Sequence, residues 1–226
     1  MKYSLVLIVI LYLIRTPLFS QTSYSIQYRP SFGQYKLSSD SIYKLNTTDS
    51  IQITALRFYI SGIELLDKNK TVWKDPIQFH LMDAFIEKTL AVTIPLNISY
   101  TKLKFNLGID STTNVSGALG GDLDPTKGMY WTWQSGYINF KLEGSSNVCK
   151  TRHNEFQFHL GGYQSPYNNL QTVFTDAGSK QNIEVGIDIQ KIMNQLNLAQ
   201  QHHIMSPGQD AMNFSEKVIN SLSIKK

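Results

Sequence analysis

The sequence predicts an all-β fold, an antiparallel β-sandwich with one or two short helices near the C-terminus. Apolar and polar residues alternate in several short segments, as where Ile138, Phe140 and Leu142 are separated by Asn139 and Lys141. Such alternation gives a strand one buried and one wet face. Many short strands separated by turns, with little helical periodicity between them, are typical of an antiparallel sandwich.

Strand patterns recur along the chain, and turn residues lie between them. The stretch Asp67-Lys68-Asn69-Lys70 and the pair Gly161-Gly162 are examples of residues that favour turns. From the N-terminal side, the expected strands cover residues 24–28, 52–63, 77–81, 90–94, 103–107, 138–142, 156–160 and 183–187.

Two helices are predicted near the C-terminus. Asp188 can cap a helix whose apolar residues, from Ile189 to Leu196, share one face. A second helix is expected after Ser206-Pro207, because Ser206 suits the N-cap and Pro207 suits the first helical position.

Residues 1–20 have the three parts of a cleavable export signal. A basic start precedes an apolar run from Leu5 to Ile14, and Ser20 supplies a small residue before the cut. The run is too short to cross a bilayer, which takes about 20 residues. We therefore expect a signal peptide over 1–20 and one periplasmic or secreted domain over 21–226, with no membrane span in the mature chain.

The charge balance argues against a nucleic-acid partner. Removing residues 1–20 takes away Lys2 and Arg15, which leaves 19 basic against 17 acidic side chains. No segment gathers lysine and arginine into the basic stripe that nucleic-acid binding requires.

No sequence pattern favours an enzyme. The Gly-x-Ser-x-Gly elbow, the His-Glu-x-x-His motif and the phosphate-binding glycine loop are all absent. Cys149 is the only cysteine, so the chain can form no internal disulfide, and nothing near it in sequence predicts a lowered thiol pKa. We expect a binding protein that is stabilised by packing.

Histidines in two similar strand segments give the sharpest functional clue. In Phe79-His80-Leu81 and in Phe158-His159-Leu160, the histidine lies on the face opposite its apolar neighbours. If the two strands lie near one another, the two imidazoles can converge, and neutral imidazole is a favoured ligand for copper and zinc. The alternative explanation is that both histidines are ordinary polar residues on the solvent-exposed face of their strands.

A third donor group, His202-His203-Ile204-Met205, comes just before the last predicted helix. A histidine and a thioether in such a short loop suit a soft ion such as Cu(I). The predicted metal ligands are therefore His80, His159 and His202, with Met205 as a soft fourth partner.

The longest irregular stretch, from Asp110 to Gly128, contains Asp122 and Asp124. The two carboxylates can take part in a calcium site, because hard cations prefer several oxygen ligands. Turn formation explains the same pair, so calcium is an alternative cofactor here.

Trp131 and Trp133 lie on one face if their segment is a strand. Two large indoles at this spacing normally build a sandwich core, but they can also form a stacking platform. The alternative function is therefore a non-metal β-sandwich module that recognises a glycan or a peptide through Trp131 and Trp133.

Three segments carry a family resemblance: Phe-Asn-Leu-Gly-Ile-Asp at 105–110, Gly-Gly-Asp-Leu-Asp-Pro at 120–125, and Met-Tyr-Trp-Thr-Trp-Gln-Ser-Gly-Tyr at 129–137. Shorter matching pieces occur at 56–61, 158–161 and 202–208. Taken in order, these segments resemble the MbnP-like family of periplasmic copper-binding proteins over most of the mature chain.

The resemblance implies an exported β-rich protein that holds copper, as Cu(I) or Cu(II), through histidines. In some members of the family a tryptophan is oxidised to kynurenine and joins the copper site, and a di-haem peroxidase-like partner performs the oxidation. Trp131 and Trp133 are the candidates here. The implied role is scavenging, storage or delivery of copper outside the cytoplasm.

Overall fold

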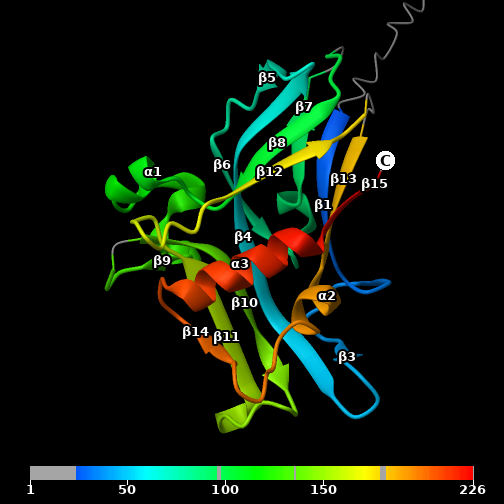
Figure 1. Cartoon of the computed structure of the whole chain (residues 1–226), viewed down its shortest axis with the longest axis vertical. Helices are drawn as coiled ribbons and strands as arrows, with labels where there is room; N and C mark the ends of the chain where they lie inside the picture. The colour runs from blue at the N-terminus through cyan, green and yellow to red at the C-terminus, as the bar shows by residue number, and fades with distance from the viewer. Residues whose placement is uncertain (1–23, 96–97, 135, 179–181, 226) are drawn as a thin grey trace, which may run out of the picture.

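The computed structural model describes residues 24–95, 98–134, 136–178 and 182–225, and the predicted signal peptide lies outside these ranges. Strands dominate and form two sheets, with strand orders β15-β13-β1-β2 and β12-β8-β4-β10-β11-β14. Figure 1 shows the long β4 running through the middle of the molecule, with β1 and β13 to one side of it. Within these ranges, no helix is long and apolar enough to cross a membrane.

The smaller sheet brings the two ends of the described chain together. β1 (Tyr24–Phe32) pairs in parallel with β13 (Asn182–Asp188), although more than 150 residues separate their first positions. The other strands of this sheet pair antiparallel with β1 or β13, and they are β2 (Tyr35–Lys36), β7 (Ala91–Ile94) and β15 (Leu222–Lys225).

The larger sheet is built around β4 (Ser50–Asp67), which is long enough to pair with strands from different parts of the chain. The first part of β4 pairs with β10 (Gly136–Ser146), and the second part pairs with β8 (Lys102–Leu107). The remaining strands are β3 (Ile42–Lys44), β5 (Lys70–Lys74), β6 (Phe79–Asp83), β9 (Tyr130–Trp131), β11 (Glu155–Gly161), β12 (Gln171–Asp176) and β14 (His203–Ile204).

The prediction of a strand-dominated fold is confirmed, but the expectation of purely antiparallel sheets is wrong. β1 pairs in parallel with β13, and β11 pairs in parallel with β14. Parallel neighbours need a long connection, because the chain must return to the same end of the sheet. In both cases other strands and helices lie within that connection.

Both expected C-terminal helices are present, and the first begins where predicted. α2 (Ile189–Met193) is capped by Asp188, whose carboxylate accepts a hydrogen bond of 3.0 Å from the N–H of Gln190. α3 (Gln209–Ser221) begins after Gly208, two residues later than expected. Pro207 precedes the helix and lies beside Gly162, just past the end of β11.

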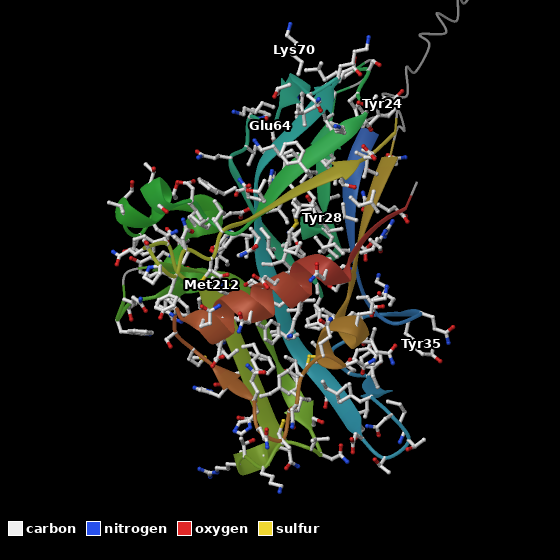
Figure 2. The ribbon with its side chains drawn as sticks, in the orientation of Figure 1. Tyr24, Tyr28, Tyr35, Glu64, Lys70 and Met212 are labelled. Atoms are coloured by element: carbon white, nitrogen blue, oxygen red, sulfur yellow. The ribbon has the colours of Figure 1, made fainter. Side chains whose placement is uncertain are left out.

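Two apolar clusters stabilise the fold. The main core lies between the sheets, and Tyr28 of β1 is one of its members (Figure 2). The ring of Tyr28 packs edge-on against Phe105 of β8, with ring centroids 5.8 Å apart. A second cluster lies on the other side of the larger sheet, which we call the outer face. Its buried members are Tyr59, Ile109, Leu123, Met129, Trp131, Tyr137 and Ile138.

The segment that covers the outer face is the stretch predicted to be irregular. It contains the short helix α1 (Ser111–Val115) and two 3-10 turns at Gly121–Leu123 and Pro125–Lys127. The hydroxyl of Tyr59 donates to the carbonyl of Asp122 at 3.0 Å, which ties this segment to β4. Part of the larger sheet is therefore covered on both faces.

Gly144 is essential for close packing of β10 on β4. A Cβ at this position would overlap the backbone carbonyl oxygen of Gln52, next to the point where the register of the two strands shifts. We expect Gly144→Ala to lower the free energy of unfolding by about 1–3 kcal/mol, the usual cost of overpacking. Chemical denaturation measures this change.

Gly120→Ala is the matched control, because nothing lies within 4 Å of the added Cβ. Its free energy of unfolding should stay within about 0.5 kcal/mol of wild type. Equal stability of the two variants would contradict the packing described for Gly144.

Candidate metal centre

β11 places His159 on the outer face of the larger sheet. Phe158 and Leu160 belong to the main core, so the alternation of the strand turns His159 and Gly161 to the opposite side. His159 is nevertheless only 6% exposed, because the outer face is covered at this point. The residue is therefore a buried imidazole on a face that the sequence predicts to be wet.

One ring nitrogen of His159 is hydrogen-bonded and the other is not. Nε2 lies 2.6 Å from Oε1 of Glu143, which comes from the neighbouring strand β10. An ionised carboxylate can only accept, so in the neutral ring Nε2 carries the proton and Nδ1 carries the lone pair. Nδ1 is buried and has no hydrogen-bond partner among the described residues.

The charges around Glu143 keep it ionised. Lys141 lies directly opposite His159 across the strand pair, and its Nζ is 3.3 Å from Oε1 of Glu143. The hydrogen bond from His159 lowers the pKa of Glu143 below 4.5, the attraction of Lys141 lowers it further, and partial burial opposes them. The ionised carboxylate of Glu143 therefore orients the imidazole of His159.

Trp131 covers the same face beside His159. A Cβ on Gly161, two residues along β11, would lie only 2.7 Å from Cζ3 of Trp131, so the indole rests directly on the glycine. The Nε1 of Trp131 is buried and has no partner among the described residues. The outer face of β11 therefore carries a buried imidazole nitrogen without a partner among the described residues, and the indole of Trp131 packs two residues further along the strand.

Trp133 lies differently from Trp131. It sits in the turn between β9 and β10 and is 65% exposed, whereas Trp131 is 5% exposed. Their ring centroids are 5.8 Å apart at a tilted angle. The expected common strand face is wrong, because the strand ends at Trp131 and the chain turns. The two indoles therefore do not form a shared exposed platform.

Met205 directly follows β14, which pairs in parallel with β11 beside His159. Gln157 lies opposite His203 and Phe158 lies opposite Ile204. β14 ends at Ile204, and the same register continued by one residue would bring Met205 level with His159. Met205 is half-buried. Two of the predicted donors, His159 and Met205, therefore come from neighbouring segments at this edge of the sheet.

His202 faces the other way. Its carbonyl still accepts from the N–H of Gln157 at 2.9 Å, so the strand alternation extends back to it. His202 therefore shares a side with Ile204, which belongs to the main core, while His203 is on the side of His159. His203, which was not among the predicted ligands, is therefore the histidine of this pair that lies on the outer face.

His80 is far from this group. It lies opposite Ile60 on β4, and β6 is on the other side of β4 from β10 and β11. Ile60 points into the main core, so His80 and His159 are on opposite faces of the sheet. The Nε2 of His80 is bonded to Asp75 at 2.7 Å instead.

The reason that the two similar segments differ is the second apolar cluster. Phe79 and Leu81, the neighbours of His80, pack against this cluster on the outer face. The apolar face of this strand is therefore buried against the second cluster. His80 and Met82 lie on the other face, which points toward the space between the sheets. The expected convergence of His80 and His159 on one patch does not occur.

Asp122 and Asp124 accept hydrogen bonds from residues of their own segment and from β6. Asp122 accepts from Nζ of Lys127 at 2.6 Å and from the N–H of Leu81 at 3.0 Å. Asp124 accepts from the N–H and the hydroxyl of Thr126, at 2.9 and 2.8 Å. These bonds are turn and capping chemistry, and the calcium prediction gains no support from them.

Across the part of the chain that the structure describes, no three histidine, cysteine, aspartate or glutamate side chains are grouped to hold a metal ion. Cys149 is buried, and burial raises the pKa of its thiol. The candidate centre therefore consists of His159 with Glu143, Met205 and Trp131, a set that includes a thioether and an indole.

The fold and site define a class of two-sheet β-sandwich proteins with a buried histidine that is hydrogen-bonded to a carboxylate. A tryptophan packs on the same strand. The family model MbnP matches residues 21–207, and the chain belongs to the MbnP family. The structure of MbnP from Methylosinus trichosporium is similar, with a TM-score of 0.56 and 13% identity, over 76% of this chain and 77% of that chain. At this identity the likeness is one of fold. No curated protein matches the chain.

Sequence reasoning missed Glu143 and His203. Glu143 follows the alternating segment 138–142 as its next polar residue. The pattern therefore predicts only that Glu143 lies on the polar face of the strand. Its contact with His159 depends on the register of β10 and β11, and alternation within single strands does not determine that register.

The Glu143 pair predicts a pH-dependent contribution to stability. Because the folded-state pKa is lowered, the contribution is present above 4.5 and is lost as the pH falls through the folded-state value. We expect Glu143→Gln to be less stable than wild type by about 1–3 kcal/mol at pH 7. Denaturation curves at pH 7 and at lower pH should show the gap closing. A gap that widens in acid would contradict the assignment.

Proposed function

We propose that this protein is exported and binds copper through His159, for scavenging, storage or delivery outside the cytoplasm. The observation that carries the proposal is the buried Nδ1 of His159, which has no partner among the described residues while Nε2 is bonded to Glu143. Membership of the MbnP family and the export pattern of residues 1–20 support the same function.

The hydrogen bond between His159 and Glu143 resembles the bond that orients metal-binding histidines in other proteins. Metal-binding histidines usually donate their second ring N–H to a carboxylate, which fixes the tautomer and raises the basicity of the ligating nitrogen. The Nε2 of His159 has this bond to Glu143 at 2.6 Å. Nδ1 would therefore be the ligating atom.

Met205 supplies the second donor. A thioether is a soft ligand that favours Cu(I), and imidazole binds copper in either oxidation state. His159 is buried, and Met205 is half-buried one residue past the end of β14, so an ion that enters from the outer face would need both side chains to turn toward it. This donor set favours reversible binding of copper over catalysis.

Trp131 is the candidate for oxidation to kynurenine by a di-haem peroxidase-like partner. Its indole rests on Gly161, two residues from His159, and its N–H has no partner among the described residues. Kynurenine would place new amine and carbonyl groups next to the ligands. The glycan or peptide alternative has less support, because only Trp133 of the two indoles is exposed.

Copper titration of single variants tests the ligand assignment. We expect His159→Ala to lose tight copper binding, and Glu143→Gln to bind about 10–100-fold more weakly, the usual effect of losing such a carboxylate. Competition with a chromophoric copper chelator, using protein made in the native host, measures the affinities.

His80→Ala is the matched control, because His80 is also bonded to a carboxylate but lies on the opposite sheet face. Its affinity should equal that of wild type. Loss of binding in His80→Ala with retention in His159→Ala would overturn the proposed centre.

Peptide mass spectrometry tests the tryptophan assignment. In protein purified from the native host we expect kynurenine at Trp131 and an unmodified Trp133, because only Trp131 lies beside His159. Kynurenine at Trp133 alone, or at neither position, would refute the assignment of Trp131 and leave the histidine test unaffected.

A further inference from the structure

β14 places an exposed histidine next to the proposed ligands. His203 lies opposite Gln157 on β11, on the same side as His159, and its side chain is exposed. We propose that His203 is the entry ligand, which takes Cu(I) from outside and passes it to Met205 and His159. This inference rests on the proposed function, since it assumes that His159 binds copper.

The three donors are arranged in order of burial. His203 is exposed, Met205 is half-buried and His159 is only 6% exposed. His203 and Met205 are two residues apart on one strand face, which corresponds to about 6.6 Å along the strand. Side chains of this length can reach a common ion between them.

A surface cleft connects the outer two donors. His203 and Met205 both line a cleft of about 370 Å³ that continues to Asp210 in the first turn of α3. Figure 1 shows β14 at the edge of the larger sheet, next to the start of α3, so the cleft lies at the rim of the molecule. An ion that enters this cleft can therefore meet His203 and Met205.

The transfer is a ligand exchange. In such an exchange the bond from copper to His203 would break as a bond to the Met205 sulfur forms, and the Nδ1 lone pair of His159 would then add to the same ion. Copper stays Cu(I) throughout, so no oxidant or reductant is needed. Soft sulfur between two imidazoles suits this path, because thioethers bind Cu(I) and exchange it readily.

The experiment measures the rate of copper uptake and the equilibrium affinity separately. Cu(I) is supplied as its bicinchoninate complex, and stopped-flow absorbance follows transfer to protein made in the native host. We expect His203→Ala to slow transfer about tenfold, while its equilibrium affinity changes less than about threefold. His203→Met should restore the rate, because it returns a soft donor.

His202→Ala is the matched control, since the adjacent histidine faces the other side of the strand. It should change neither the rate nor the affinity. Circular dichroism of each variant checks that the fold is kept.

The outcomes separate the two proposals. An unchanged transfer rate in His203→Ala, or equal slowing by His202→Ala, overturns the entry role but leaves copper binding by His159 intact. A loss of affinity in His203→Ala as large as in His159→Ala makes His203 a resident ligand and also overturns the entry role. Wild-type protein that takes up no copper refutes the proposed function itself.

Discussion

The pairing register of β10 with β11 is the constraint on which the candidate centre depends. It sets Lys141 opposite His159 and Glu143 opposite Gln157, so that a single carboxylate oxygen reaches the imidazole at 2.6 Å. A slip of one residue would turn every side chain of β11 to the other face and would expose Phe158 while burying Gln157. The cost of exposing the main core therefore also protects the geometry of the site.

The outer face acquires its properties from the segment that covers it. Residues 109–131 bury Tyr59 and Ile138 in a second cluster, and Trp131 extends this cover toward His159. Away from water, a hydrogen bond to a carboxylate orients an imidazole more firmly, and an unpaired nitrogen is more costly. The cover thus changes a polar strand position into a buried one, where Nδ1 of His159 has no hydrogen-bond partner among the described residues.

Local patterns predicted the elements well and their mutual placement poorly. The alternation around His159 and the capping role of Asp188 could be predicted, because both depend on neighbours in sequence. The face occupied by His80 could not, since it depends on an apolar cluster contributed by a segment 30–50 residues away. The choice between His202 and His203 likewise required the pairing of β14 with β11.

The parallel pairing of β1 with β13 has a consequence for how the molecule forms. Until residues 182–188 are available, β1 can pair only with β2 and β7 among the strands of its sheet. Contacts between such distant parts of a chain form late, because a large loop must close first. A chain that emerges from its N-terminal end therefore leaves one edge of β1 without its parallel partner until most of the chain has appeared.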